Sequence, residues 1–460
     1  MRIDRRQFGS GALASLAFAG LARSASAAPA ETYRNEVAGY GPLLRDRAGF
    51  LDLPRGFGYS VVSRAGEAMN DGFIAPDHFD GMGCIPLGGS RVALVRNHEL
   101  KPEHRERGPT GGSARLERRL AQSAFFGADG EGRPLPGGTS TVIYDFTRKR
   151  RESQYLSLVG TAVNCAGGTT PWGSWLTCEE TEMKRPDVGR DHGWVFEVPA
   201  RHRGLVQPIP LKAMGRFRHE AAAVDPHTGI VYLTEDQDDG LFYRFLPNAR
   251  QELAEGGRLQ ALGLRDISYD TRNWGSNDLQ PGGTAKAVWI EIEDVESPDD
   301  DLRLRGRQAG AAIFARGEGI HRGNGEYYFT CTSGGAARLG QIMRYVPSPH
   351  EGQAGERDAP GRLQLFVESR ESAVMNYADN IVVAPWGDLI VCEDRSDGGF
   401  NHLKGITPAG KVYTFACLNA DTELAGACFS PDGGTMFVNA YRPGKTLAIT
   451  GPWVRSAREG

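Results

Sequence analysis

Residues 379–394 read DNIVVAPWGDLIVCED, and this stretch decides the fold because its pattern recurs along the chain. It contains a polar start, a short apolar run, a turn with proline and glycine, and a second apolar run that ends in acidic residues. Two apolar runs on either side of such a turn are typical of a β-hairpin. The stretch therefore predicts a hairpin with polar ends at Asp379 and Asp394.

Similar units recur along the chain. Six copies can be laid out, at residues 80–99, 164–180, 219–236, 317–333, 379–394 and 425–439. A third apolar run follows each hairpin, and a fourth follows most of them, at 154–159, 287–292, 363–368 and 412–417. Four antiparallel strands per repeat are typical of a propeller blade. We predict an all-β fold, a six-bladed β-propeller. The alternative, a β-sandwich, gives no reason for similar hairpins with acidic ends.

The two ends of the chain complement each other. The sixth copy runs out of chain before a fourth strand, whereas residues 59–63 form an apolar run with no hairpin partner of its own. We predict that this N-terminal strand closes the ring. Segments 101–140 and 248–285 exceed what a blade needs, and we predict them as loop or short-helix insertions over one face. Residues 114–125 have helical periodicity.

The N-terminal residues have the pattern of an export signal. Arg5 and Arg6 precede an apolar, Gly/Ala-rich run at 8–22, and a small-residue cleavage site lies at 24–28. This combination is typical of a twin-arginine signal peptide. We predict a signal peptide at 1–28 and a single propeller domain at 29–460. The protein would be exported by the twin-arginine translocation (Tat) machinery to a periplasmic or extracellular location.

Composition disfavours several classes of partner. The 53 Lys and Arg residues against 57 Asp and Glu residues give a net charge of −4. A mildly acidic surface argues against nucleic acid or an anionic membrane as partner. Beyond the signal, no run approaches the roughly 18 apolar residues of a membrane span. We expect a monomer without a stable membrane anchor. The chain has seven cysteines, which leaves at least one unpaired, and the sequence gives no disulfide pairing.

The hairpin ends converge on one place. A hairpin starts and ends on the same side of its sheet, so in a propeller all these ends meet at one mouth of the axial channel. The residues placed there are His98, Glu99, Asn164, Cys165, Glu179, Glu180, His219, Glu220, Glu235, Asp236, Glu318, Asp379, Asn380, Glu393 and Asp394. So many carboxylates stay ionised together only if cations compensate them. We predict a cluster of metal ions at this mouth.

The ligand types narrow the choice of metal. Carboxylate oxygens suit Ca²⁺, whereas a thiolate among them indicates a softer or more Lewis-acidic metal such as Fe or Zn. Cys165 lies at the polar start of a strand, beside Asn164 and before two glycines. We predict it as a metal ligand, although a buried and inert thiol is the alternative. Arg316 and Arg442 lie near the same mouth, and either can bind an anion through its planar guanidinium.

Four long motifs carry a resemblance to a known family. They lie at residues 164–180, 215–237, 377–394 and 426–453. These motifs resemble those of the PhoX family of exported alkaline phosphatases. The resemblance implies a six-bladed propeller in which an Fe³⁺ and Ca²⁺ cluster hydrolyses phosphomonoesters. It also implies metal ligands at Cys165, Glu180, Glu220, Glu318 and Asp379, and a phosphate-binding arginine at Arg316.

The predicted site combines these ligands with Glu99 from the hairpin ends, and we assign Arg316 and Asn380 to catalysis. The substrate would be a small phosphomonoester, a dianion that a bare acidic mouth repels and that bound metals attract. A calcium-dependent lactonase or esterase propeller is the alternative enzyme, and it would need fewer acids and no thiolate. A non-enzymatic binding propeller is a third reading. It would present aromatic and arginine side chains instead of buried acids.

Overall fold

The computed structural model describes residues 33–453, except 266, 268, 276–277 and 396–397. The predicted signal peptide at 1–28 lies outside these residues. The described chain is all-β, as predicted, with strands β1 to β26 and short helices, of which α3 (Leu302–Gln308) is the longest. None of these helices has the length and apolar character needed to cross a membrane.

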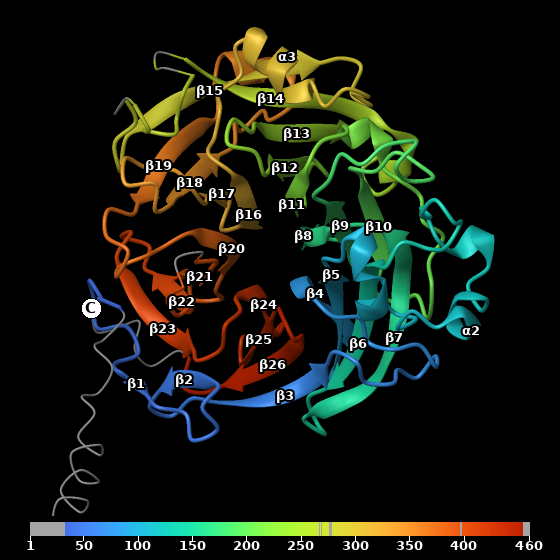
Figure 1. Ribbon diagram of the computed structural model, residues 1–460. Coiled ribbons are helices and arrows are strands. Elements are labelled where there is room, and N and C mark those ends of the chain that lie inside the picture. Colours follow the sequence, from blue (N-terminus) through green and yellow to red (C-terminus); the bar gives the residue numbers. More distant parts are fainter. Residues whose placement is uncertain (1–32, 266, 268, 276–277, 396–397, 454–460) are drawn as a thin grey trace, which may run out of the picture.

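The strands are arranged around a central axis, as Figure 1 shows. The innermost strands are the first strands of the predicted hairpins: β4 (Phe79–Gly88), β8 (Asn164–Thr169), β11 (His219–Val224), β16 (Gly317–Arg322), β20 (Ala378–Val383) and β24 (Leu424–Phe429). Each of these strands contacts the next, and β24 contacts β4, so the inner strands close a ring. The arrangement is therefore propeller-like.

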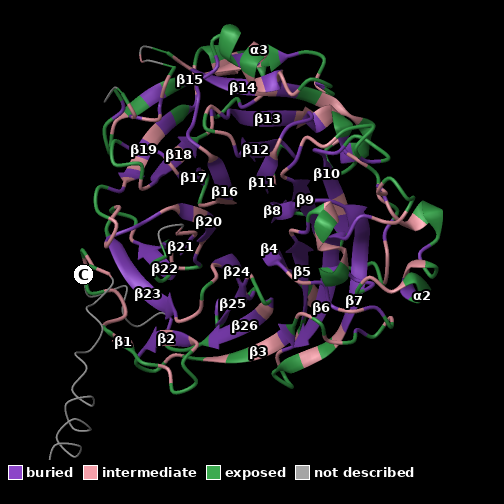
Figure 2. Ribbon diagram, viewed as in Figure 1, coloured by how far each residue is buried: buried purple, intermediate pink, exposed green. Residues whose placement is uncertain are grey.

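The second strand of each hairpin pairs with the first, and these strands were also predicted. They are β5 (Arg91–His98), β9 (Ser174–Glu179), β12 (Val231–Glu235), β17 (Tyr327–Cys331), β21 (Leu389–Glu393) and β25 (Thr435–Ala440). The third strands are β6 (Gly137–Asp145), β10 (Val195–Pro199), β13 (Phe242–Pro247), β18 (Gln341–Val346), β22 (His402–Ile406) and β26 (Lys445–Thr450). Buried residues concentrate in these strands (Figure 2).

The division into sheets differs from the prediction. The described strands form five hydrogen-bonded sheets rather than six separate ones. The strand β15 (Thr284–Ile292) pairs with both β14 (Gly257–Arg265) and β19 (Arg362–Glu368), and so joins two meanders into one nine-stranded sheet. The prediction of a loop insertion at 248–285 is wrong for β14, which occupies part of that segment. Only the first half of β14 alternates, with Leu259 and Ala261 buried, whereas Ala261, Leu262 and Gly263 are buried in succession.

The N-terminal strand closes the ring, as predicted. The strand β3 (Gly58–Arg64) pairs with β26, with Tyr59 opposite Ile449. It completes a four-stranded sheet, as β7 (Arg150–Thr161) does for the first hairpin. The strands β1 (Leu43–Leu44) and β2 (Leu51–Pro54) were not predicted. β2 pairs with β23 (Val412–Leu418), so the N-terminal residues cover the outer edges of two sheets.

The segment at 101–140 contains short helices, as predicted. They are η1 (Pro102–Arg107), α2 (Ala114–Glu117) and η2 (Gln122–Ala124). The predicted helical stretch at 114–125 is thus divided between α2 and η2. Leu116 and Leu120 pack with Phe73 and Leu156, which fixes this insertion on the outside of the first sheet.

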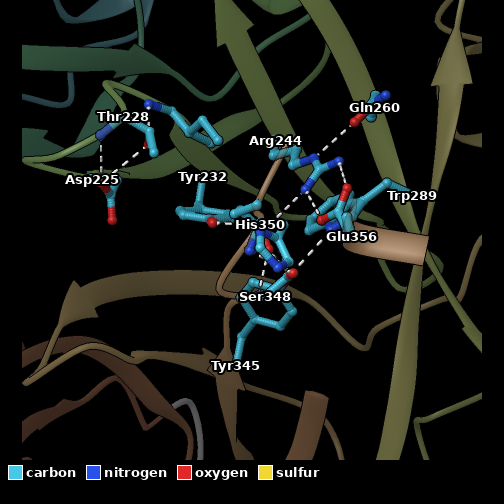
Figure 3. A network of polar contacts seen from close by, with 12 residues as sticks. Asp225, Thr228, Tyr232, Arg244, Gln260, Trp289, Tyr345, Ser348, His350 and Glu356 are labelled. Atoms are coloured by element: carbon cyan, nitrogen blue, oxygen red, sulfur yellow. Dashed lines mark hydrogen bonds and ion pairs between the residues drawn. The ribbon is translucent and has the colours of Figure 1, made fainter. Parts of the chain in front are cut away.

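A buried ion-pair network joins the two meanders of the nine-stranded sheet (Figure 3). Arg244 on β13 donates to Glu351 at 2.7 Å, and it also pairs with Glu356 at 2.7 Å. Tyr345 on β18 donates to Glu351 at 2.8 Å. The Arg244 guanidinium lies over the ring of Trp289 on β15, 4.4 Å from its centre. Because these charges are buried and paired, loss of one partner would leave the other uncompensated.

Candidate metal centre

Each inner hairpin has an irregularity near the start of its first strand. In β20 the register of pairing shifts between Ala378 and Ile381, and the other hairpins shift at 79–82, 164–167, 219–222, 317–320 and 425–428. A β-bulge of this kind turns a side chain out of the regular alternation of the strand. The bulges contain Asp80, Cys165, Glu220, Glu318, Asp379 and Gly426. Five of the six bulges therefore place an acid or a thiol at equivalent positions around the axis, and Gly426 occupies this position in the sixth.

In four of these bulges, the residue two positions before the acid or thiol has the left-handed backbone conformation. These residues are His78, Val163, Arg316 and Tyr377, with φ values of 52°, 50°, 55° and 52°. This conformation is costly for residues that carry a Cβ atom. At Tyr377 the carbonyl accepts a hydrogen bond of 2.9 Å from the N–H of Asp394, at the end of the second hairpin strand. Such bonds close the hairpins and offset the strain.

Small residues allow the inner strands to approach each other. A methyl group placed on Gly81 would lie 2.5 Å from Cα of Ala166, and one on Gly319 would lie 2.7 Å from the nitrogen of Ile381. Both distances are shorter than a van der Waals contact. Neighbouring inner strands therefore meet backbone to backbone, which brings their bulge residues close to one another.

Two groups of potential metal ligands come together at the bulges. Cys165, Glu180 and Glu220 form one group, and the other contains Glu220, Glu318 and Asp379. Within each group the ligand atoms lie within 4.8 Å of one another. Glu220 belongs to both groups. Five of the six residues predicted as metal ligands are thus gathered in one cluster of the described chain.

Glu99, the remaining predicted ligand, belongs to neither group but lies beside them. The hydroxyl of Tyr441 donates to Glu99 at 2.6 Å. Burial raises the pKa of Glu99, and the negative charges of Asp394 and Asp236 raise it further. Glu99 therefore shares the electrostatic environment of the cluster and is held by a tyrosine at the same mouth.

Burial and mutual repulsion act on the carboxyl groups of the cluster. Burial is the largest cause that raises the pKa values of Glu180, Glu220 and Glu318 well above the ordinary range, and neighbouring carboxylates add to it. The pKa of Asp379 rises to about 7 because of burial and the charge of Asp394. Acids in this state bind protons in place of cations, and metal ions would displace those protons. The residues present therefore fit a metal cluster.

The thiol of Cys165 lies in the same environment. Burial raises its pKa well above the ordinary value, and the charges of Glu220 and Glu180 add to the shift. Its Sγ lies 3.3 Å from the carbonyl oxygen of His219 and 3.5 Å from that of Glu220. Both Cys165 and Cys178 pack in the same hydrophobic cluster. The two cysteines of this hairpin differ because, among the described residues, only Cys165 belongs to a group of potential metal ligands.

Two adjacent acidic residues stand at the end of the second strand in several hairpins, and the two residues make different contacts. Glu179 accepts hydrogen bonds from the backbone N–H groups of Gly193 and Trp194 and from His192 at 2.6 Å, which ties β9 to the next segment. Glu235 and Glu393 are fully buried in the same way. The residues after them interact with the cluster instead, namely Glu180, Asp236 and Asp394.

The remaining residues that were predicted at the mouth form hydrogen bonds with the strands and loops around them. His98 contacts the Ser140 hydroxyl at 2.8 Å, and His219 contacts the carbonyl of Gly215 at 2.9 Å. Asn164 accepts from Thr161 at 2.6 Å. These contacts orient the hairpins, and burial lowers the pKa values of both histidines. Both imidazoles are therefore neutral near pH 7.

Arg316 lies against the cluster, as predicted. Its Nε and Nη2 atoms donate to the two carboxylate oxygens of Asp236 at 2.8 and 3.0 Å, and Nη2 also donates to Glu318 at 2.6 Å. The negative charge of Glu318 is the largest influence on Arg316 and keeps its pKa raised, so the guanidinium stays charged. Arg442, the other candidate, lies near His78 and His104; burial is the main cause that lowers the pKa values of these histidines, and the positive charge of Arg442 adds to it.

Asn380 holds the bulge of β20. Its side-chain nitrogen donates to Asp379 Oδ1 at 3.0 Å, and its side-chain oxygen accepts from the N–H of Gly426 at 2.7 Å. The amide therefore connects a predicted ligand with the neighbouring inner strand. This geometry suits a residue that positions Asp379.

Two acids of the cluster were absent from the predicted site. Burial raises the pKa of Asp80 well above normal, with added effects of Glu99 and Asp379. The same is true of Glu423, whose neighbours include Asp394 and Asp379. Asp80 begins the first repeat, at the position of Glu220 in the third, so the repeat contained a signal for it. Glu423 precedes the sixth repeat and has no such signal.

Known proteins resemble this chain in sequence pattern and in fold. The family model described as Alkaline phosphatase PhoX matches residues 38–444. A solved structure of Pseudomonas fluorescens PhoX in complex with vanadate, a transition state analogue, is 18% identical with a TM-score of 0.65, and the match covers 91% of this chain and 97% of that chain. A gluconolactonase from Xanthomonas campestris is 12% identical over 85% of this chain and 100% of its own, with a TM-score of 0.37. A search of curated protein sequences found no significant match.

Proposed function

Because this chain belongs to the alkaline phosphatase PhoX family, we propose that it hydrolyses phosphate monoesters at a metal cluster held by the bulge residues of its inner strands. The family establishes the phosphomonoesterase activity. The metal ligands, the identity of the metals and the roles of single residues are our proposal. The observation that carries it is the pair of ligand groups that share Glu220.

The donor atoms support a mixed cluster. The group with Cys165 offers a thiolate beside the carboxylates of Glu180 and Glu220, which suits Fe³⁺. The group of Glu220, Glu318 and Asp379 offers only oxygen ligands, which suits Ca²⁺. When bound, the cations supply positive charge that attracts the phosphoryl oxygens.

The side chains around the cluster would bind and orient the substrate. The ion pair with Asp236 fixes the guanidinium plane of Arg316. Binding of a phosphate would therefore cost little further conformational entropy of this side chain. Asn380 holds Asp379 in place, and we therefore propose it as a positioning residue. Tyr441 would do the same for Glu99.

We propose for the wider organisation what the sequence predicts. We propose that the nine-stranded sheet counts as two blades linked by β15, which with the four other sheets gives a six-bladed propeller. The closed ring of inner strands supports this count. We also propose a single domain at 29–460. The family is exported, and the twin-arginine signal at 1–28 would direct that export.

The proposal is tested by metal analysis of protein purified without chelator, combined with hydrolysis of a chromogenic phosphomonoester. We expect iron and calcium in the protein, and we expect a chelator to abolish turnover and lower the melting temperature together, because metal binding is linked to the folded state. Re-addition of the metals should restore both. Full activity in chelator would contradict the metal cluster, and calcium without iron would contradict the thiolate site.

A further inference from the structure

A second feature lies at the far ends of the inner strands. The acidic cluster is at their starts, whereas a cavity of 440 Å³ is lined by residues further along the same strands. Its lining includes Cys84, Arg322, Val383 and Cys428. The lining begins at residues next to the predicted ligands, such as Gly81, Ala166 and Asn380, so the cavity continues the axial channel away from the metal centre. Two cysteines from different strands line its far part.

Cys84 and Cys428 are neighbours across the junction of the first and last inner strands. A methyl group placed on Gly426 of β24 would lie 3.0 Å from Cβ of Met82 on β4, so the two strands are in direct contact there. Both strands run from the acidic mouth towards the cavity. Cys84 and Cys428 each lie two residues further on, where both side chains join the same hydrophobic cluster.

The Cys84 thiol also influences the pKa of the Cys428 thiol. Burial is the main cause that raises the pKa of Cys428, and a hydrogen bond with the Cys84 thiol adds to it. Cys84 is partly exposed, whereas Cys428 is buried with 8% of its surface exposed. An oxidant that enters the cavity would therefore reach Cys84 first and find Cys428 directly behind it.

We propose that Cys84 and Cys428 form a disulfide that joins the first and last inner strands of the ring. The bond would be made by exchange with a disulfide oxidant. Cys84 loses its proton to water and attacks the oxidant disulfide, which releases one thiol and leaves a mixed disulfide. Cys428 loses its proton and attacks Sγ of Cys84, which releases the second thiol. The protein thus gives up two electrons and two protons, and the oxidant disulfide takes them as two thiols.

The position of this bond gives it a structural effect. The ring is otherwise closed by hydrogen bonds between β3 and β26 and by packing between β24 and β4. A disulfide at Cys84 and Cys428 would close a long loop that contains most of the chain. Long closed loops restrict the unfolded state most, so the oxidised protein should melt a few degrees higher. Neither cysteine belongs to a ligand group among the described residues, so the metal centre should keep its activity.

The test uses the metal-loaded protein with oxidised glutathione as oxidant. Remaining thiols are then alkylated under denaturing conditions, and peptides are mapped by mass spectrometry. We expect one linked peptide pair that contains Cys84 and Cys428, with an intact mass lower by about 2 Da for the two hydrogen atoms lost. The melting temperature should rise, and dithiothreitol should reverse the rise.

Single variants provide the controls. Cys84→Ser and Cys428→Ser should each abolish both the linked peptide and the increase in melting temperature. Cys331→Ala, which removes another buried thiol, should keep them. The proposal is overturned if the wild-type protein remains fully alkylated at its seven cysteines, if glutathione stays attached to Cys84, or if another pair is linked. These outcomes do not depend on phosphatase activity.

Discussion

Arg316 and Asp236 form a two-pronged ion pair at the edge of the cluster, with Nε···Oδ1 and Nη2···Oδ2 distances of 2.8 and 3.0 Å. A third bond, from Nη2 to Glu318, is 2.6 Å long. Among the described residues none accepts a hydrogen bond from Nη1 of Arg316. The pair therefore fixes the guanidinium while one of its nitrogen atoms stays available to a phosphoryl oxygen.

Arg316→Ala should weaken substrate binding without loss of metal. A hydrogen bond to a charged group contributes about 1.5–3 kcal/mol, so we expect kcat/KM to fall on the order of 10- to 100-fold. Inorganic phosphate should also become a weaker competitive inhibitor. Steady-state kinetics and metal analysis of the same preparation check both expectations.

Arg272→Ala is the matched control for that variant. Arg272 makes the same two-pronged pair with Asp270, at 2.8 and 2.7 Å, but belongs to neither ligand group. Its removal should leave kinetic constants and metal content unchanged. If Arg316→Ala lost its metals, Arg316 would hold the cluster together and would not be primarily a substrate residue.

Glu235→Gln should flatten the dependence of stability on pH. Glu235 accepts hydrogen bonds from the N–H of Leu241 and from Tyr243, and burial raises its pKa from 4.5 to about 8. The folded state therefore holds a proton that the unfolded state releases. This contribution to stability is fully present below pH 4.5 and is lost as the pH rises through about 8.

Thermal unfolding at several pH values checks this prediction. The wild-type melting temperature should fall more steeply between these two pH values than that of Glu235→Gln, whose neutral amide retains an acceptor oxygen. The same slope in both proteins would mean that Glu235 does not carry the proton. Saturating metal in all samples keeps the cluster constant.

The hairpins and the cluster could be predicted because each repeat contains local signals. A Pro/Gly turn between apolar runs predicts a hairpin, and the repeat places Glu220 and Asp379 at equivalent positions. The strand β14 was missed because it lies in a segment without a turn signal of the repeat and alternates only over its first half. The link that β15 makes to β19 depends on long-range pairing, which the local pattern does not contain.

The separate roles of adjacent acids could not be predicted. Glu179 and Glu180 are chemically equal in the sequence, and the difference between them arises from the N–H groups of Gly193 and Trp194, which come from a later segment. Asn380 was assigned to catalysis, but its bonds to Asp379 and Gly426 depend on the contact between two inner strands. Such roles follow from the tertiary structure alone.

Gly426→Ala should disturb the closure of the ring. Gly426 has φ of 59°, and an added methyl group would lie 2.4 Å from the carbonyl oxygen of Asp80. The strand β24 would have to move away from β4, and we expect a loss on the order of 2–4 kcal/mol in the free energy of unfolding. Chemical denaturation measures this loss.

Gly89→Ala separates the clash from the backbone strain. Gly89 also has φ of 59°, but no atom lies within 4 Å of the position of an added methyl group. This variant should therefore lose only the strain, about 1 kcal/mol. Equal losses in Gly426→Ala and Gly89→Ala would show that the inner strands are not in close contact at Gly426.

Replacement of the two cysteines in one hairpin distinguishes a metal ligand from a core residue. The Sγ atom of Cys165 lies within 4.8 Å of carboxylate oxygens of Glu180 and Glu220. Cys165→Ala should therefore remove iron and most of the turnover. Cys178 is fully buried and, among the described residues, belongs to neither ligand group, so Cys178→Ala should keep the metals and lose about 1 kcal/mol of stability. Metal analysis and thermal unfolding of both variants decide the matter. Iron retained by active Cys165→Ala would leave an oxygen-only calcium site as the better description of the centre.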